Sequence, residues 1–521
     1  MAAKTRLMSL PALRRLRWTW LRKTSQVAAL LIFLALFVAS RRGSWRPDVV
    51  NLPMRLDPLA MLAETLASRT ILSGSLLALL TILLSLLAGR AWCGWLCPLG
   101  TTLDIFNFWK KKRKNQPQIP ETWRRGKYLL LLAILFSALF TNLTLLIFDP
   151  LTLVFRTLSV SIWPALDQAL TVIESAMYQV PWLRGLLEVL DRSLRPGIFP
   201  SEPVFYRETI LYAAIFLLVI GLNMLAPRFW CRYLCPLGGM LGLFSKTALL
   251  QRQVGDSCKA CTICTQTCPM GTIDPQRNYA SDPGECTLCM DCLENCPRRG
   301  TSFRTAFYKP NWNTYDPGRR EALLAIGTAV AGITLFRSSL FARRTSATLL
   351  RPPGGAENDL TTKCIRCGEC LRACPTSGLQ PAQGEAGFEG WMTPVLVPRL
   401  GYCDYSCHAC GMVCPVQAIP PMNLEEKRSQ VIGNAYIDTD RCIAWADQTD
   451  CIVCEEMCPL PEKAIWLEAH TITLRDGEQV IVNLPHVDRT TCIGCGICEY
   501  KCPVGGEAAI RIFTARDSVT G

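Results

Sequence analysis

The stretch Cys258-Lys-Ala-Cys261-Thr-Ile-Cys264-Thr-Gln-Thr-Cys268-Pro269 decides the fold of this chain. Its spacing, C-x2-C-x2-C-x3-C-P, is typical of thiolates that hold [4Fe–4S] clusters. Six cysteine sets of this kind occur, each followed by proline; four keep the strict spacing, and the fourth and fifth lengthen the first interval to x3 and x8. The sets are Cys258, Cys261, Cys264 and Cys268; Cys286, Cys289, Cys292 and Cys296; Cys364, Cys367, Cys370 and Cys374; Cys403, Cys407, Cys410 and Cys414; Cys442, Cys451, Cys454 and Cys458; and Cys492, Cys495, Cys498 and Cys502. The sequence therefore predicts six [4Fe–4S] clusters.

Disulfides and zinc are the alternatives for so many cysteines. Cysteines two residues apart are poorly placed to bridge one another, because a disulfide needs a defined Cα separation and direction. Zinc sites pair two C-x2-C motifs across a longer stretch, without the third cysteine and the C-P dipeptide. His408 follows Cys407 in what resembles a stretched haem-attachment motif, but Cys410 and Cys414 complete a cluster set there. His408 is therefore interpreted as incidental.

The sets must also be paired. In two-cluster ferredoxins the fourth cysteine of each run ligates the other cluster. The first two sets are thus expected to form the groups Cys258/Cys261/Cys264/Cys296 and Cys286/Cys289/Cys292/Cys268. The last four sets can pair as neighbours or nest, third with sixth and fourth with fifth. The x8 interval from Cys442 to Cys451 resembles the four-cluster subunits of molybdenum oxidoreductases, whose sets nest, and this resemblance favours nesting.

Four apolar stretches in the first 250 residues are near the length that a membrane span needs, about 20 residues. They are Thr24–Ser40, Thr70–Trp92, Tyr128–Phe148 and Thr209–Ala226. Residues 1–350 carry a net charge of +21 and residues 351–521 one of −8. The positive charge flanks the apolar stretches, and no basic patch with interleaved aromatics lies on a soluble module, which excludes nucleic acid as a partner. Positive-inside counting predicts a cytoplasmic N-terminus.

The membrane part is internally duplicated. Asp57-Pro58-Leu59, a span and Cys93-Gly-Trp-Leu-Cys97-Pro-Leu-Gly form one copy. Asp149-Pro150-Leu151, a span and Cys231-Arg-Tyr-Leu-Cys235-Pro-Leu-Gly form the other. Both copies run in the same direction, so they are parallel repeats. The duplication suggests that Cys93, Cys97, Cys231 and Cys235 face one another and bind a further metal or cluster; free or disulfide-bonded thiols are the alternative.

Residues 1–350 contain no histidine, so a b-type haem is not expected there. The candidate proton-accepting side chains are instead Asp57 and Asp149, because acids at membrane depth are often functional. Capping of a turn before proline is the simpler interpretation of each.

Arg319-Arg320 precedes the apolar run Ala322–Phe336 and resembles a Tat export signal. A short anchor or an interfacial helix is the alternative. Without a clean A-x-A cleavage site, we expect an uncleaved fifth span. The predicted fold is an α-helical membrane domain of four spans (1–250), a cytoplasmic α+β two-cluster ferredoxin domain of the bacterial type (251–310), the fifth segment with a linker (311–350), and a periplasmic four-cluster ferredoxin domain (351–521).

The motifs also resemble a known family. Residues 1–300 resemble NapH, the membrane subunit of the quinol dehydrogenase that serves periplasmic nitrate reductase, on their four spans, two C-x3-C-P-L-G motifs and two cysteine sets. Residues 319–521 resemble its exported partner NapG, on the twin arginine and four sets. The chain thus resembles a fusion of the two within the polyferredoxin superfamily.

This resemblance implies a quinol dehydrogenase module in the bacterial inner membrane. It would pass electrons from menaquinol or ubiquinol to a periplasmic molybdenum oxidoreductase or c-type cytochrome. One alternative is a membrane polyferredoxin that reduces metals during oxidase or reductase maturation. Another is inward electron flow to a cytoplasmic acceptor.

Overall fold

The computed structural model describes residues 18–41, 46–107, 119–193, 199, 204–305, 349–473 and 479–514, together with residues 320, 323, 326, 327 and 330. The chain divides into two compact units. Unit 1 comprises Met1–Phe33, Leu80–Tyr128 and Ile220–Asp316, and unit 2 comprises Leu34–Leu79, Leu129–Val219 and Pro317–Gly521. The predicted twin-arginine segment, apart from Arg320 and a few isolated positions, lies outside the described residues.

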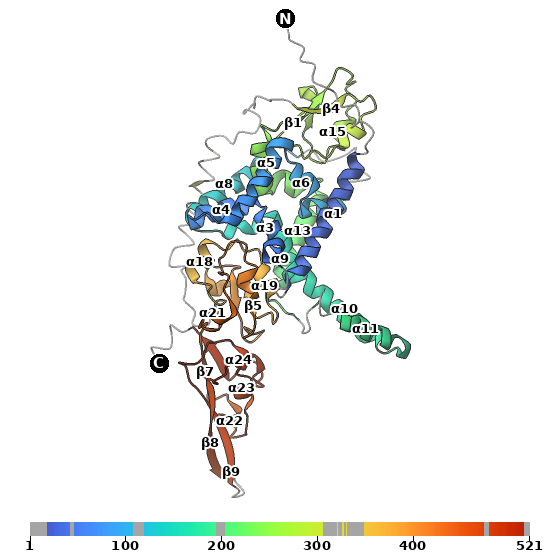
Figure 1. The fold of residues 1–521 in the computed structure, drawn as a ribbon. Helices are drawn as coiled ribbons and strands as arrows, with labels where there is room; N and C mark the ends of the chain where they lie inside the picture. Colours follow the sequence, from blue (N-terminus) through green and yellow to red (C-terminus); the bar gives the residue numbers. More distant parts are fainter. Residues whose placement is uncertain are drawn as a thin grey trace. The chain divides into compact units, whose positions relative to one another are not determined.

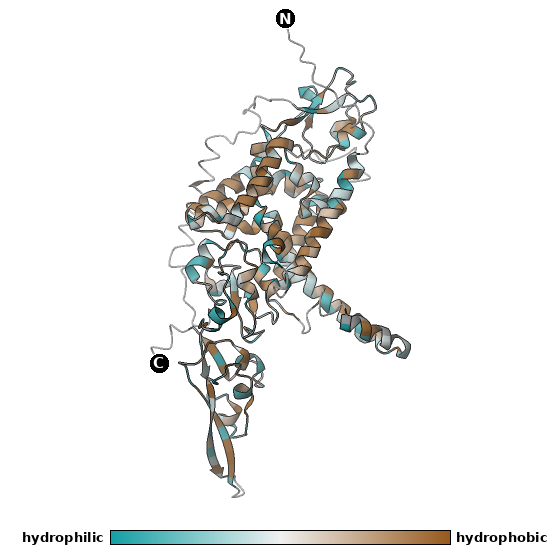
Figure 2. Cartoon of the chain, viewed as in Figure 1, coloured by the Kyte–Doolittle hydropathy of each residue, from teal (hydrophilic) through white to brown (hydrophobic). Residues whose placement is uncertain are grey.

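In the part of the chain that the structure describes, four helices contain residues of both units: α1 (Trp18–Ala39), α5 (Ala78–Ala88), α8 (Arg125–Leu139) and α13 (Thr209–Gly221) (Figure 1). Hydrophobic side chains predominate along α1, α5 and α13 (Figure 2). Among the described residues, α1 is the one helix long and apolar enough to cross a membrane, by length and composition. The four-span domain therefore stays a prediction.

The other apolar stretches are shorter helices than the sequence predicts, because local turns interrupt them. The 3-10 helix η3 (Ser73–Leu77) leads into α5, and Gly89, at φ +58°, separates α5 from α6 (Ala91–Trp95). Likewise Thr141, at φ +62°, separates α8 from the 3-10 helix η6 (Thr144–Phe148). Left-handed backbone cannot continue a right-handed helix, so the second and third predicted spans each contain more than one element.

Each repeat begins two helices in the same way, with a polar or thiol side chain followed by proline. Asp57 caps α4 (Pro58–Ser68) and Asp149 caps α9 (Pro150–Thr157). Cys97 caps α7 (Pro98–Ile105) and Cys235 caps α14 (Pro236–Ser245). Proline suits the first helical position because its missing N–H would be unpaired there. The remaining helical elements of the duplicated region are α2 (Pro47–Val50), α3 (Leu52–Arg55), η5 (Glu121–Arg124), η7 (Leu158–Ile162), α10 (Trp163–Met177), η8 (Pro181–Leu183), α11 (Arg184–Ser193), η9 (Leu222–Met224) and η10 (Trp230–Leu234).

Unit 1 ends in a small α+β domain. Strand β1 (Leu250–Val254) pairs antiparallel with β4 (Thr301–Thr305), and β2 (Ile273–Asp274) pairs with β3 (Ala280–Ser281). Helices α15 (Ile263–Thr267) and α16 (Asp291–Glu294) pack against each other. Each helix follows the second cysteine of its set, so the domain has the ferredoxin layout that the spacing predicts.

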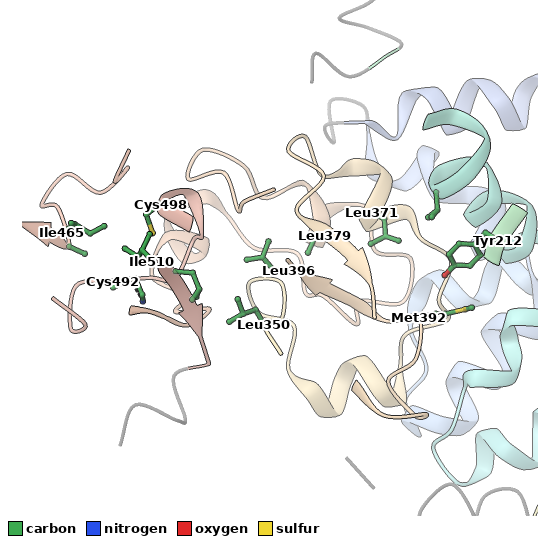
Figure 3. Close-up of a cluster of buried hydrophobic side chains, with 14 of the residues drawn as sticks. Tyr212, Leu350, Leu371, Leu379, Met392, Leu396, Ile465, Cys492, Cys498 and Ile510 are labelled. Atoms are coloured by element: carbon green, nitrogen blue, oxygen red, sulfur yellow. Dashed lines mark hydrogen bonds between the residues drawn. The ribbon is translucent and has the colours of Figure 1, made fainter. Parts of the chain in front are cut away.

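The described residues of unit 2 form three two-stranded antiparallel sheets. They are β5 (Leu379–Pro381) with β6 (Pro394–Leu396), β7 (Asn434–Ile437) with β10 (Ile510–Phe513), and β8 (Ile465–Thr473) with β9 (Gln479–Val487). The helices of this part are α18 (Glu357–Thr362), α19 (Glu369–Ala373), α20 (Ala409–Met412), α21 (Leu424–Arg428), α22 (Ile443–Ala446), α23 (Val453–Glu456) and α24 (Ile497–Lys501). One buried cluster runs through them, with Leu371, Leu396, Cys498 and Ile510 among its members (Figure 3). Because the cysteines are part of this core, the domain is built around them.

Candidate iron–sulfur sites

The four strict cysteine sets share an unusual backbone conformation around their second cysteine. The residues on both sides of that cysteine have φ between 48° and 85°. These pairs are Ala260/Thr262, Leu288/Met290, Arg366/Gly368 and Gly494/Gly496. Left-handed backbone is unfavourable for residues other than glycine, and such turns point successive N–H groups to one side, where they bind anionic centres including iron–sulfur clusters. The strained loops therefore fit a negatively charged cluster.

In unit 1 the thiols surround two cavities. One is lined by Cys258, Cys261, Cys264 and Cys296, and the other by Cys268, Cys286, Cys289 and Cys292. This is the crossed grouping that the sequence predicts. The crossed grouping arises because α15 and α16 lie side by side, so that the fourth cysteine of each set lies beside the first three cysteines of the other set.

In unit 2 neighbouring sets exchange their fourth cysteines. The groups are Cys364, Cys367, Cys370 and Cys414; Cys403, Cys407, Cys410 and Cys374; Cys442, Cys451, Cys454 and Cys502; and Cys492, Cys495, Cys498 and Cys458. Burial, and next the thiolates of the same group, raise the pKa of Cys370. The predicted nesting of third with sixth and fourth with fifth is wrong.

The position of Cys458, the last cysteine of the fifth set, shows this correction directly. Nesting predicts that Cys458 completes the group of the fourth set. In the structure the charge of Cys458 instead acts on the thiols of Cys492 and Cys495, whose pKa values it helps to raise. Cys458 also packs against the buried cluster that contains Cys498. It therefore belongs to the group of the sixth set, and the prediction for Cys458 is corrected accordingly.

The reason is the packing of short helices. Helix α19 packs against α20, and α23 packs against α24. Because α23 ends just before Cys458, its contact with α24 carries that cysteine to the sixth set. The x8 interval, which favoured nesting, only lengthens one loop, and that loop holds α22 packed against β9. The pairing is therefore decided by helix contacts that the cysteine spacing does not encode.

The groups of unit 2 also follow one another in space. Cys374 links the third and fourth sets, and the backbone N–H of Cys403 donates to the carbonyl of Cys495 at 2.8 Å. The order of neighbouring groups is thus third, fourth, sixth and fifth, each named by the set that supplies most of its thiols.

The two C-x3-C-P motifs come together inside unit 1. All four thiols are buried, and burial followed by the charges of Cys231, Cys93 and Cys97 raises the pKa of Cys235. The sulfur atoms of Cys97 and Cys235 accept from the N–H groups of Gly100 (3.5 Å) and Gly238 (3.2 Å), at the first turns of α7 and α14. Helix N-termini favour thiolates, so these N–H groups act against the effect of burial. Because the charges of Cys231, Cys93 and Cys97 all act on Cys235, the two pairs lie together in the structure, as the duplication suggests.

Two arginines that the sequence reasoning missed join the repeats reciprocally. Arg228 donates to the carbonyl of Cys93 (3.4 Å), and Arg90 donates to the carbonyl of Cys231 (3.3 Å). Each arginine lies three residues before the cysteine of its own repeat and contacts the other repeat. Arg228 also forms a two-pronged ion pair with Asp104 at 2.6 and 2.7 Å. The repeated pattern R-x-W-C-x3-C-P-L-G is the sequence signal that would have found them.

The C-x3-C-P motifs rest directly on the second cluster group. Trp95 donates to the carbonyl of Leu288 (3.0 Å), between Cys286 and Cys289. Arg232 donates to the carbonyl of Pro269 (2.8 Å), next to Cys268. Both motifs therefore contact loops of the same group, Cys268/Cys286/Cys289/Cys292.

Glu285, the residue before Cys286, is fully buried among cations of the duplicated region. It pairs with Arg90 (3.1 Å), Arg124 (3.4 Å) and Lys127. Although burial opposes it, these three cations hold the pKa of Glu285 at about 2. Burial lowers the pKa of Lys127 to about 8, against the pull of Glu285. Glu285 and its partners thus form a buried charged ring of three cations and one anion beside the second cluster group. The ring attaches the loop that begins at Cys286 to the duplicated region.

The thiol groups fit iron–sulfur clusters better than single metal ions. Among the described ranges, no three Cys, His, Asp or Glu side chains converge closely enough to hold one metal ion. The thiols are instead spread around cavities with apolar walls, such as that lined by Ile437, Val453 and Pro485. Thiolate is the ligand that iron–sulfur clusters use, and a cluster of several iron atoms spreads its ligands.

Models of known families match the chain at these cysteines. A 4Fe-4S binding domain matches twice, at residues 70–116 and 209–255, which are the two copies of the repeat. Two 4Fe-4S dicluster domains match residues 278–375 and 363–418, and another 4Fe-4S binding domain matches residues 484–510. No solved structure matches the chain.

Curated relatives cover part of the chain. The methylamine utilization ferredoxin-type protein MauM of Methylorubrum extorquens is 36% identical over 38% of this chain and 90% of its own length. The ferredoxin-type protein NapG of Escherichia coli is 34% identical over 38% of this chain and 85% of its own length. An uncharacterized protein of Methanocaldococcus jannaschii is 26% identical over 45% of this chain and 82% of its own length.

The chain belongs to the MauM and NapG family of ferredoxin-type proteins. It is an iron–sulfur electron-transfer protein with several 4Fe-4S domains. The family relationship accounts for a share of the chain only, and the union of NapH-like and NapG-like parts is a proposal.

Gly94 of the first C-x3-C-P motif lies against a cluster loop in this ferredoxin-type protein. A Cβ atom at Gly94 would lie 2.1 Å from the carbonyl oxygen of Thr287. Gly94→Ala is therefore expected to displace that loop and to destabilise unit 1 by about 1–3 kcal/mol, the usual cost of overpacking. Gly221→Ala is the matched control, since a Cβ at Gly221 meets nothing within 4 Å. Hydrogen exchange of the Cys286–Cys296 loop measures the difference, and equal exchange in both variants would contradict the expected contact.

Asp57 and Asp149 are both buried, and each caps a helix as the simpler interpretation predicts. The structure also brings their side chains together within unit 2. His408 precedes α20 and lies at its N-terminal cap position without a capping hydrogen bond.

Proposed function

We propose that this protein is a membrane-bound quinol dehydrogenase module that joins a NapH-like membrane part to a NapG-like exported ferredoxin. Electrons from menaquinol or ubiquinol pass along its clusters to a periplasmic oxidoreductase. The thiols of Cys93, Cys97, Cys231 and Cys235 hold a seventh cluster beside those of the six sets.

The observation that carries this proposal is where the boundary between the units falls. It lies at Phe33/Leu34, Leu79/Leu80, Tyr128/Leu129 and Val219/Ile220, inside each of the four predicted spans. Unit 1 also collects the segments predicted to be cytoplasmic, and unit 2 those predicted to be periplasmic. A chain that crosses a bilayer four times has this property, because its contacts separate into an inner and an outer half. The division thus supports four spans, although three helices are short.

The order of the thiol groups supports electron transfer. In unit 1 the two C-x3-C-P motifs contact the loops of the second group, which adjoins the first. In unit 2 four groups follow one another from the third set to the fifth. Two such series are what a relay between partners on two sides of a membrane needs.

The net charge of −8 on residues 351–521 suits a basic docking partner. A c-type cytochrome or a molybdenum oxidoreductase with a basic face is the partner class that we propose. The MauM relative is named for methylamine utilization, whereas the NapG relative is named only as a ferredoxin-type protein, so the terminal acceptor is a matter for experiment.

The decisive experiment uses the iron-loaded protein in liposomes. Addition of menaquinol or ubiquinol is expected to reduce clusters, which EPR spectroscopy detects, whereas the oxidised quinones are expected to leave the spectrum unchanged. Reduction by dithionite but by neither quinol would contradict the quinol dehydrogenase. A reporter fused after Gly521 is expected to be active outside the cytoplasm, and cytoplasmic activity would contradict the topology.

A further inference from the structure

Asp57 and Asp149 form a buried pair of carboxyl groups in unit 2. Both side chains are 0% exposed. One oxygen of Asp57 accepts from the N–H groups of Leu59 (2.9 Å) and Ala60 (3.3 Å). One oxygen of Asp149 accepts from those of Leu151 and Thr152, each at 3.0 Å. The duplicated Asp-Pro-Leu sequence thus builds the same cap twice.

The second oxygen of each carboxyl has no donor. Asp57 Oδ2 and Asp149 Oδ1 are buried and make no hydrogen bond to any other group. The two side chains are adjacent, and they can hydrogen-bond to each other only when one proton is bound between them. Two ionised carboxylates repel each other in a buried site, so such a pair binds its first proton tightly. Burial, and then the charge of Asp149, raises the pKa of Asp57 well above its ordinary value.

Arg156 lies between this pair and a cluster loop. It is buried, and it follows Asp149 on α9. Its Nη2 donates to the carbonyl of Ile147 (3.1 Å), two residues before Asp149. Its Nη1 donates to the carbonyl of Arg366 (3.2 Å), between Cys364 and Cys367. The charges of the carboxyl pair and of the cysteine loop therefore both act on the guanidinium of Arg156.

We propose that Asp57 and Asp149 form a single proton-binding site whose occupancy follows the charge at the Cys364/Cys367/Cys370/Cys414 group. The site takes up one proton on a carboxylate oxygen, forming one O–H bond, when one electron reaches that group. The electron comes from a quinol or from an added chemical reductant, and the proton comes from water or from the quinol. The inference rests on the proposed function only for the identity of the electron donor.

Other charged and titratable groups lie on the surrounding elements. They are Arg55 on α3, Glu64 on α4, Arg156 on α9, Tyr212 on α13, and Arg366 and Glu369 in the cysteine loop. Of these, Glu64 and Glu369 are also buried without a hydrogen-bond donor. The test therefore changes the pair itself and leaves these groups in place.

The experiment is a potentiometric titration of the full, cluster-loaded chain at several pH values, followed by EPR. Where the pair titrates, the potential of one cluster is expected to fall by about 59 mV per pH unit, the shift for a tenfold change in a one-electron couple. Cys367→Ser is expected to remove this component. In Asp57→Asn/Asp149→Asn the cluster is expected to remain and its potential to become independent of pH. Asparagine is as good a helix cap as aspartate, so the double variant is expected to fold.

Asp440→Asn, at an exposed aspartate, is the matched control and is expected to keep the slope. A second readout is the infrared band of a protonated carboxyl in the reduced-minus-oxidised spectrum, expected in the control and absent from the double variant. A pH-independent potential in the unmodified protein, or an unchanged slope in the double variant, would overturn the inference. If quinols fail to reduce the clusters while the slope persists with dithionite, the proposed function fails and the proton site stands.

Discussion

A chain carrying Cys367→Ser is expected to lose about four of its iron atoms, and adding Cys414→Ser is expected to remove no more. The reason is that Cys414 completes the group of Cys364, Cys367 and Cys370, so both substitutions damage the same cluster. Iron analysis of the purified single and double variants measures this, with EPR spin counting as an independent check.

The control for this prediction is Cys367→Ser combined with Cys502→Ser. Cys502 lines the cavity of Cys442, Cys451 and Cys454, so the second substitution is expected to remove about four further iron atoms. Nested sets predict the opposite pattern, because Cys502 would then share a cluster with Cys367. Equal iron in the Cys502 double variant and the single variant would contradict neighbour pairing.

Replacing Glu285 by glutamine is expected to destabilise unit 1 by about 3–5 kcal/mol, the cost of removing one partner of a buried ion pair. The substitution leaves Arg90, Arg124 and Lys127 buried without their shared anion. Lys127→Met is expected to cost less, because Glu285 keeps both arginines. Hydrogen exchange of peptides around Cys286 measures the free energy of local opening in each variant.

Glu121→Gln is the matched control for Glu285→Gln, since Glu121 is an exposed glutamate of the same unit. We expect its exchange to be unchanged, as is usual for surface substitutions. If Glu285→Gln behaved like Glu121→Gln, the buried ring would not hold the cluster loop in place. Hydrogen exchange in peptides of unit 2 is expected to stay unchanged in both variants.

The cysteine spacing predicted the local fold of every strict set, because three thiolates within seven residues can meet one cluster only if the loop turns tightly around it. The duplication likewise predicted the meeting of Cys97 and Cys235, and the Asp-Pro and Cys-Pro dipeptides mark four helix starts. The cysteine loops and the helix starts are short in sequence, so local geometry controls them, whereas the meeting of Cys97 and Cys235 follows from the symmetry of the two copies. The apolar stretches were predicted less well, since Gly89 and Thr141 interrupt two of them.

The sequence by itself thus determined an iron–sulfur protein, its six cysteine sets and its internal duplication. Only the tertiary structure decided which sets exchange their fourth cysteine, and so where Cys458 lies, because that depends on α19 packing against α20 and α23 against α24. The same holds for Glu285 among its cations, for the exchange of Arg90 and Arg228 between repeats, and for the meeting of Asp57 with Asp149. Each of these three joins residues at least 90 positions apart. Such contacts form where buried charge must find a partner, and sequence spacing does not reveal which distant partner the packed helices supply.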